Sequence, residues 1–142
     1  MKARELVFTL FASLFLNSNI SQADEISTHF DQCVKAAAGD GSQIVACQTD
    51  ETKAQDAELN KTYQYLIRKL RPFPAALLKK SQHAWIKFRD SECEFQSSRV
   101  IGGPQGVIAA AQVEFRTNCL LNQTLNRKIT LQKYLEQSKH EF

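Results

Sequence analysis

Four cysteines downstream of a predicted export signal constrain this chain of 142 residues more than any other feature. The four are Cys33, Cys47, Cys93 and Cys119. Disulfides persist where the compartment is oxidising, and an even number of cysteines in a short exported chain indicates a disulfide framework. The sequence therefore predicts two disulfide bridges.

The export signal is predicted over residues 1–23. Lys2 and Arg4 give a positive start, and residues 6–16 form an apolar run of 11 residues. A bilayer-spanning helix needs about 20 residues, whereas a run of this length is typical of a signal peptide. Small residues at Ser21 and Ala23 predict cleavage after Ala23. No cysteine lies near this position, so no lipid attachment is predicted.

The remaining chain, residues 24–142, is expected to form one domain. It carries 16 basic and 14 acidic residues, a net charge of +2. A dedicated nucleic-acid binder is expected to carry a basic stripe, so this balance argues against nucleic acid as a partner. No later segment is predicted to span a membrane.

Breaks in the sequence predict four helices, over residues 26–38, 42–70, 74–97 and 107–135. Gly39-Asp40-Gly41 ends the first, and Ser42 is the expected N-cap of the second. Pro72 and Pro74 separate the second from the third, and the glycine-rich stretch 102–106 separates the third from the fourth. The predicted fold is all-α, a small antiparallel bundle of one short and three long helices with two disulfides.

Apolar spacing predicts the buried face of each helix. The first helix is expected to bury Phe30, Cys33, Val34 and Ala37, and the second Leu59, Tyr63, Leu66, Ile67 and Leu70. The expected inner face of the third helix is Leu77, Leu78, Ser81, Ala84, Trp85 and Phe88. That of the fourth is Ile108, Ala111, Phe115, Cys119, Leu125 and Ile129.

The favoured pairing joins Cys33 to Cys47 and Cys93 to Cys119. The first two cysteines lie about six residues on either side of a helix break, so they face each other in a helical hairpin. The other two flank the glycine-rich stretch. A bridge between Cys47 and Cys93 remains an alternative. The chain has no C-x-x-C motif and no zinc-type histidine spacing, so neither a metal site nor a cofactor is predicted.

No catalytic residues are predicted. Four carboxylates crowd the second helix: Asp50, Glu51, Asp56 and Glu58. We interpret them as a solvated helix face, the alternative being an acid–base pair as in glycosidases. The histidines, His29, His83 and His140, are scattered. An exposed loop can provide a contact surface, so Gly102, Gly103, Pro104 and Gln105 are candidate binding residues.

Gln82, Trp85 and Arg89 share one face of the third helix by spacing. The favoured interpretation is structural: Trp85 anchors the core, and Arg89 pairs with a carboxylate of the second helix. A ligand site is the alternative.

These residues also carry a family resemblance. The shared features are Cys47, Glu58-Leu59-Asn60 followed by Tyr63, Gln82, the segment Trp85-Ile86-x-Phe88-Arg89-Asp90, Cys93, Gly102-Gly103 and Cys119, with Cys33 in the first cysteine position. This pattern resembles the N-terminal-like domain family of the bacterial lysozyme inhibitor LprI. The resemblance implies an exported, all-helical, disulfide-bonded bacterial domain that inhibits lysozyme. Because the chain lacks a lipid-attachment cysteine, it is expected to be soluble in the periplasm.

The resulting hypothesis is a periplasmic protein-binding module without enzymatic activity. It would inhibit a lysozyme or another cell-wall hydrolase by occluding its cleft. Animal-type lysozymes are strongly basic, so the acidic patch from Asp50 to Glu58 is expected to supply charge complementarity. The alternatives are an immunity or envelope-stress protein that binds a secreted toxin or envelope component, and a small hydrolase that uses Glu51 and Glu58. Its oligomeric state is left open.

Overall fold

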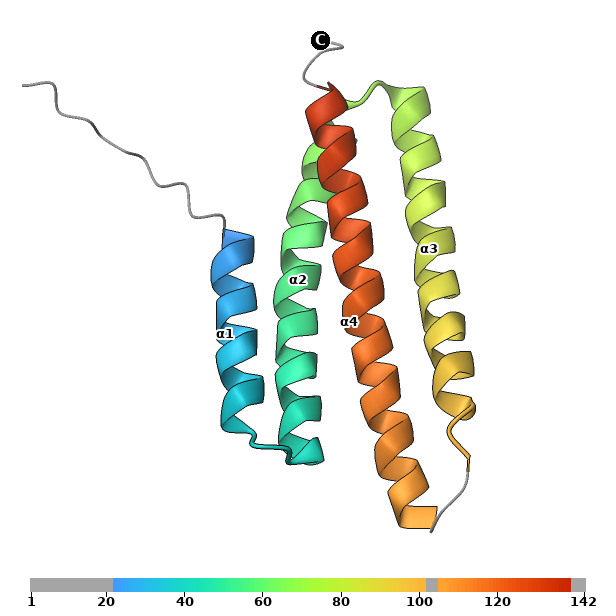
Figure 1. Cartoon of the computed structure of the whole chain (residues 1–142). Coiled ribbons are helices and arrows are strands. Elements are labelled where there is room, and N and C mark those ends of the chain that lie inside the picture. The colour runs from blue at the N-terminus through green and yellow to red at the C-terminus, as the bar shows by residue number, and fades with distance from the viewer. Residues whose placement is uncertain (1–21, 102–104, 139–142) are drawn as a thin grey trace, which may run out of the picture.

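The computed structural model describes residues 22–101 and 105–138, and these residues form four helices (Figure 1). They are α1 (Gln22–Ala36), α2 (Gly41–Lys69), α3 (Pro72–Ser98) and α4 (Gln105–Ser138). No strand occurs in these two ranges. The predicted all-α fold of one short and three long helices is therefore confirmed.

The helices lie side by side in the order α1, α2, α4, α3 (Figure 1). Consecutive helices are antiparallel, so α2 and α4 run in the same direction. The fourth helix packs against both α2 and α3, whereas α1 packs against α2 alone. One hairpin therefore consists of α1 and α2, the other of α3 and α4, and the main contact between them is the α2–α4 interface.

Each hairpin contains one disulfide. Cys33 is bonded to Cys47 with their Cα atoms 5.8 Å apart, and Cys93 to Cys119 with a Cα separation of 5.4 Å. The favoured pairing is confirmed, and the alternative bridge between Cys47 and Cys93 is excluded. Both bridges lie nearer to the end of the bundle where α1 turns into α2 than to the opposite end. We call this end the bridge end.

The opposite end, where α2 turns into α3, contains the apolar core, and we call it the core end. Four buried leucines form this core: Leu59, Leu66, Leu78 and Leu131. Partly buried side chains of Tyr63, Ile67, Leu70, Trp85 and Leu135 pack against them. The buried face that apolar spacing predicts for α2 is correct.

The predicted inner faces of α3 and α4 are wrong at six positions. The exposed residues are Leu77, Ser81, Ala84, Phe88, Phe115 and Ile129. Polar residues occupy the inward positions instead, because Gln82 of α3 and Thr124, Arg127 and Lys128 of α4 are buried. The spacing of apolar residues cannot predict a buried face that consists of polar residues.

A polar seam joins α2 to α4, and we define it by Gln48, Glu51, Gln55, Thr117, Thr124 and Lys128. The amide of Gln55 donates to a carboxylate oxygen of Glu51 at 2.7 Å and accepts from the ammonium of Lys128. Nearer the bridge end, the Thr117 hydroxyl donates to the side chain of Gln48. Gln55 is completely buried, so these bonds replace the apolar contacts that α2 and α4 make at the core end.

Two helix starts differ from prediction. The N-cap of α2 is Asp40 rather than Ser42: its side chain accepts from the backbone amides of Ser42 at 2.9 Å and Gln43 at 3.1 Å. The first helix begins at Gln22, four residues before the predicted start. The predicted cleavage after Ala23 falls in its first turn, and residues 1–21 lie outside the described part of the chain.

Candidate protein-binding groove at the bridge end

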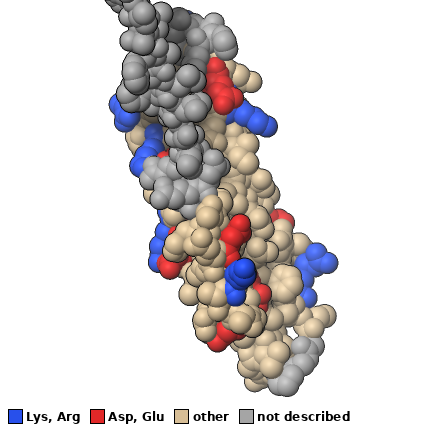
Figure 2. Space-filling view, turned by 60° about the vertical axis from the view of Figure 1, so that its left-hand side comes forward, with Lys and Arg blue, Asp and Glu red and all other residues tan. Residues whose placement is uncertain are grey.

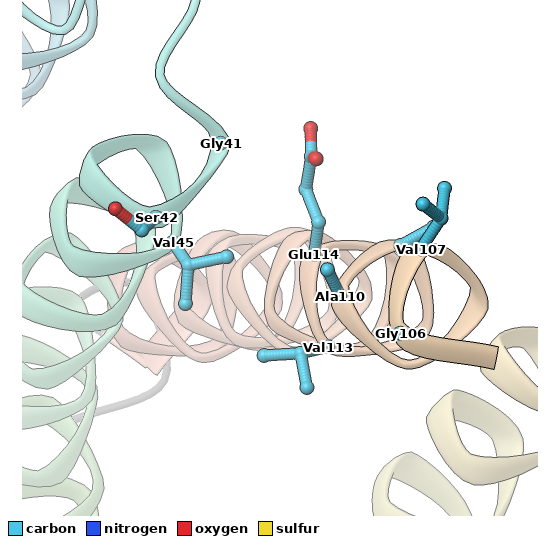
Figure 3. Close-up of a pocket in the computed structure, with 9 residues that line it drawn as sticks. Gly41, Ser42, Val45, Gly106, Val107, Ala110, Val113 and Glu114 are labelled. Carbon is cyan, nitrogen blue, oxygen red and sulfur yellow. The ribbon is translucent and has the colours of Figure 1, made fainter. Parts of the chain in front are cut away.

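A groove of about 690 Å³ opens between the first turns of α2 and the first turns of α4 (Figure 3). Small and aliphatic residues form most of its wall, with one carboxylate. They are Gly41, Ser42, Val45, Gly106, Val107, Ala110, Ala111, Val113 and Glu114. Small side chains on both helices leave this space unfilled, and the buried leucine core lies at the other end of the bundle.

The groove has an apolar wall and an acidic rim. Val45 of α2 and Ala110 of α4 border the gap between the helices, while the carboxylate of Glu114 points away from α4 (Figure 3). A Cβ atom placed on Gly41 would lie 3.7 Å from Oε2 of Glu114, so this carboxylate stands beside the start of α2. Negative charge is stabilised at a helix N-terminus.

Asp40 adds a second carboxylate to this rim, because it precedes Gly41. The pKa of Asp40 lies below its ordinary value of 3.8, since its carboxylate accepts hydrogen bonds from the Ser42 hydroxyl and from Gln43. Neither Asp40 nor Glu114 forms an ion pair within the described ranges. The rim can therefore accept a basic side chain from a partner.

The Asp40 cap is expected to stabilise the fold by an amount that depends on pH. Because the folded-state pKa of Asp40 is lowered, its charge stabilises the fold above the unfolded-state value near 3.8, and this contribution disappears as the pH falls through the folded-state value. We expect Asp40→Asn to melt at a lower temperature than the parent at pH 7, and the difference in melting temperature to be smaller near pH 3.

Thermal unfolding followed by circular dichroism at both pH values measures this change. Asp31→Asn is the matched control, because Asp31 is also exposed but lies within α1 rather than at a cap. An equal difference between parent and Asp40→Asn at the two pH values would contradict the cap's contribution.

A second hollow, of about 530 Å³, lies between α3 and α4 on the other side of the first half of α4. Its wall includes Phe95, Arg99, Ile101 and Phe115, and all four are exposed. Figure 2 shows that uncharged residues cover much of the bridge end on the face drawn. Recessed apolar surface with a polar rim is typical of a site of protein association.

The predicted loop site can be located only in part. Gly102, Gly103 and Pro104 lie outside the described residues, so their predicted binding role stays a prediction. Gln105 is exposed and begins α4, next to Gly106 in the groove wall. Loop composition alone could not identify the groove, because its two walls come from residues more than 60 positions apart.

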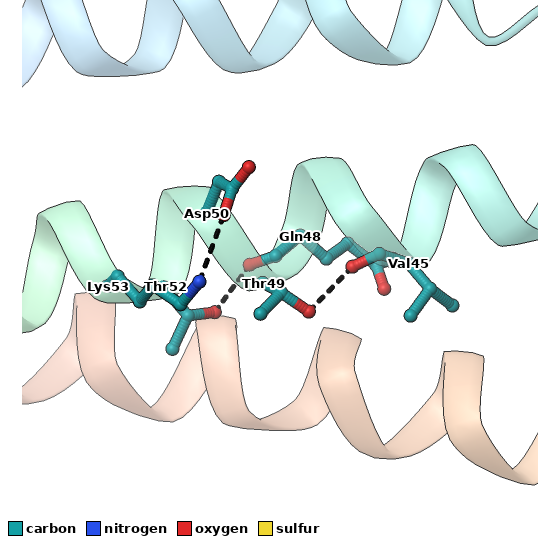
Figure 4. A network of polar contacts seen from close by, with 6 residues as sticks. All are labelled: Val45, Gln48, Thr49, Asp50, Thr52 and Lys53. Carbon is teal, nitrogen blue, oxygen red and sulfur yellow. Dashed lines mark hydrogen bonds and ion pairs between the residues drawn. The ribbon is translucent and has the colours of Figure 1, made fainter.

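Two of the four carboxylates in the predicted acidic patch on α2 are paired with lysines. Asp50 pairs with Lys53 at 3.2 Å (Figure 4), Glu58 pairs with Lys61 at 2.5 Å, and Asp56 accepts a hydrogen bond from Asn60. Glu51 was expected in a solvated face but is only 5% exposed. Asp56, like Asp40 and Glu114 at the groove rim, has no cationic partner within the described ranges.

Trp85 packs against the core as predicted, but the partner of Arg89 is not the predicted carboxylate of α2. Arg89 lies 5.0 Å from the Trp85 ring centre and pairs with Asp90 of its own helix at 2.8 Å, so the predicted pairing with α2 is wrong. Arg127 of α4 donates to Gln82 at 2.9 Å, and burial lowers the pKa of this guanidinium. The segment thus ties α3 to α4.

Metal-binding geometry is absent from the described ranges, where no three His, Cys, Asp or Glu side chains are placed to hold an ion. His29 and His83 are exposed, and His140 lies outside these ranges. Among the described helices, none is long and apolar enough to cross a membrane.

The fold and its surface define a class of protein: a small helical domain that is bridged by disulfides, as exported proteins are, and that presents recessed apolar surface at one end. The chain belongs to the family described as Lysozyme inhibitor LprI, whose model matches residues 33–131. That range includes all four cysteines and the residues of the groove, and it confirms the resemblance seen in the sequence.

Two relatives are similar over about two thirds of the chain. An uncharacterized protein of Rhizobium meliloti (strain 1021) is 29% identical over 107 residues, which cover 66% of this chain and 73% of the relative. The uncharacterized protein YecT of Escherichia coli (strain K12) is 33% identical over 106 residues, which cover 67% of this chain and 64% of YecT. No solved structure matches the chain.

Proposed function

We propose that this protein is an exported protein-binding module that inhibits a lysozyme by covering its substrate cleft. The description of its family supports this proposal. The observation that carries it here is the groove at the bridge end, with an apolar wall and two uncompensated carboxylates at its rim. Inhibition by occlusion requires no chemistry, so the module is proposed to have no catalytic activity.

Rigidity favours this mechanism. A surface that is already in its bound conformation loses less entropy on association, and each hairpin beside the groove is held by a disulfide. A specific interface buries about 800 Å² on each partner. The groove and the hollow around Phe95 lie on either side of the first half of α4.

Charge complementarity is local rather than global. The domain has a small positive net charge, which gives no general attraction to a basic lysozyme. Glu114 and the capping residue Asp40 form no ion pair within the described ranges, so an arginine or lysine of the enzyme can bind beside their carboxylates. The apolar wall would then pack against the aliphatic part of that side chain.

The compartment follows from the same proposal. We propose that residues 24–142 act as one domain in the periplasm after cleavage of the signal peptide behind Ala23, without a lipid anchor. Two disulfides support an oxidising compartment.

The acid–base alternative has little support. Glu51 is buried against Gln55, whereas Glu58 is bound to Lys61. Seven residues separate them on one helix, which is about 10 Å along its axis. An immunity protein for a secreted toxin is the other alternative, and no feature of the described residues favours it.

The test is inhibition of peptidoglycan lysis by purified protein against a panel of lysozymes and amidases. We expect equimolar parent to slow lysis by at least one enzyme, and Glu114→Lys to weaken inhibition by roughly tenfold or more because it reverses the rim charge. Ala110→Trp, which fills the groove, should have a similar effect.

Two matched variants serve as controls. Glu136→Lys makes the same charge change at an exposed position of the core end, and Ala109→Trp adds the same bulk on α4 outside the groove wall. Both should inhibit within about twofold of the parent. Failure of the parent to bind or inhibit any enzyme of the panel would refute the function, and equal losses in test and control variants would refute the groove.

A further inference from the structure

We propose that the core end of the bundle binds the surface of an anionic lipid membrane. This end carries a basic collar around an exposed phenylalanine, and it lies at the opposite end of the bundle from the groove. The inference does not rest on lysozyme inhibition, since it uses residues on a different part of the molecule.

The charge pattern is the first observation. Residues 59–89 contain eight basic residues and no acidic residue. Five of the eight flank the α2–α3 turn: Arg68, Lys69, Arg71, Lys79 and Lys80. All five are exposed, and none forms an ion pair within the described ranges.

Few carboxylates oppose this charge. Near the core end, Glu58 is already paired with Lys61. Glu136, in the last turn of α4, lies three positions after the exposed Lys133 on the same helix. The small net charge of the chain therefore hides a concentrated positive end, and such a cluster attracts an anionic lipid surface within about a Debye length.

The apolar element is the second observation. Phe73 is 74% exposed at the start of α3, between Pro72 and Pro74, and Leu77 one turn later is 52% exposed. Residues four apart lie on the same helix face, so these two side chains form one apolar ridge. The prolines fix the backbone beside Phe73, which keeps the ring at the tip of the turn.

Aromatic side chains at the same end reinforce this pattern. Tyr65 and Tyr134 are exposed, and the Lys69 ammonium lies 5.6 Å from the Tyr65 ring centre. Aromatic rings with a polar edge are enriched where protein meets lipid headgroups. Basic residues around a short apolar ridge are the composition of a peripheral membrane contact.

Lipid fits these residues better than a soluble polyanion. A nucleic acid or acidic polysaccharide would use the basic collar, and a base could stack on Phe73. Neither gives a reason for the exposed Leu77 beside it. An acyl-chain boundary accommodates both side chains, while the headgroups neutralise the collar.

The test is sedimentation of the protein with vesicles of phosphatidylcholine, with and without phosphatidylglycerol. We expect binding to the anionic vesicles that weakens as salt is raised, and little binding to phosphatidylcholine alone. Each basic residue near an anionic surface strengthens binding about fivefold, so Lys79→Glu/Lys80→Glu should lower partitioning by at least roughly tenfold.

Matched variants test whether vesicle binding depends on the position of the basic residues rather than on the net charge of the chain. Lys35→Glu/Lys53→Glu makes the same charge change at exposed positions outside the core end, and it should bind within about twofold of the parent. Phe73→Ser should lower partitioning by about fivefold or more, whereas Val107→Ser, which truncates an exposed groove residue, should not. Circular dichroism verifies that each variant is folded.

Phe73→Trp adds a positive readout, because its emission should shift to the blue when anionic vesicles are added, relative to the parent with Trp85 alone. Three outcomes would overturn the proposal: equal binding to both vesicle types, equal losses in the two double variants, or tighter binding to a DNA oligomer or acidic polysaccharide that Phe73→Ser leaves unchanged. The last outcome would assign the collar to a soluble polyanion.

Discussion

Replacing Cys93 and Cys119 together by alanine is expected to lower the free energy of unfolding by about 3.5 kcal/mol. The bridge closes a loop with a sequence separation of 26 residues, and the stabilisation follows from the entropy that this loop removes from the unfolded chain. For a domain of this size, the loss corresponds to a melting temperature lower by roughly 10–20 °C, which thermal unfolding measures.

Removal of the other bridge should have a different structural consequence. Cys33→Ala/Cys47→Ala opens a shorter loop, with an expected cost of about 3 kcal/mol. Because α1 packs against α2 alone, we expect amide hydrogen exchange to accelerate in α1 while amides around Leu131 remain protected. Equal melting temperatures of the Cys93→Ala/Cys119→Ala variant and the parent would show that the Cys93–Cys119 bridge does not determine stability.

Replacing Lys128 by methionine is expected to cost about 3–5 kcal/mol, the range for breaking a buried charged network. Lys128 and Glu51 are each 5% exposed and are linked through the side chain of Gln55. Without the ammonium, the Glu51 carboxylate stays buried with no cation, and the Gln55 oxygen loses its donor. Denaturant unfolding measures the difference.

Two further variants isolate the charge. Lys133→Met makes the same substitution at an exposed position of α4 and should change stability by no more than about 0.5 kcal/mol. Glu51→Gln combined with Lys128→Met removes both charges, so the pair should be more stable than Lys128→Met alone. Equal stabilities of Lys128→Met and Lys133→Met would show that the seam makes no net contribution.

The sequence was sufficient for the helices and the disulfide pairing because local signals specify both. Glycine and proline mark the breaks near residues 40, 72 and 103. Cys33 and Cys47 are equidistant from the first break and so face each other in a hairpin, whereas Cys93 and Cys119 flank the third break less symmetrically. Burial of Leu59 and Leu66 was predictable for a similar reason, because the apolar spacing on α2 is regular.

The polar seam and the groove could not be predicted in this way. Gln55, Thr124 and Lys128 look like surface residues to any pattern based on hydropathy, and their burial depends on which faces of α2 and α4 meet. The same cause explains why apolar spacing wrongly predicts Phe115 and Ile129 in the core. Helical spacing predicts a carboxylate of α2 as the partner of Arg89, but the neighbouring Asp90 is its partner in the structure.

The placement of the disulfides also sets the mechanics of the groove. Each bridge stiffens one hairpin, and no bridge crosses from one hairpin to the other. From Thr117, whose hydroxyl donates to Gln48 of α2, α4 extends about 15 Å back to its first turn, at 1.5 Å per residue. A tilt of about 5° in this part of α4 would change the width of the groove mouth by more than about 1 Å. The two bridges therefore stiffen the walls of the groove, whereas the contacts of the polar seam hold the walls at a fixed distance from each other.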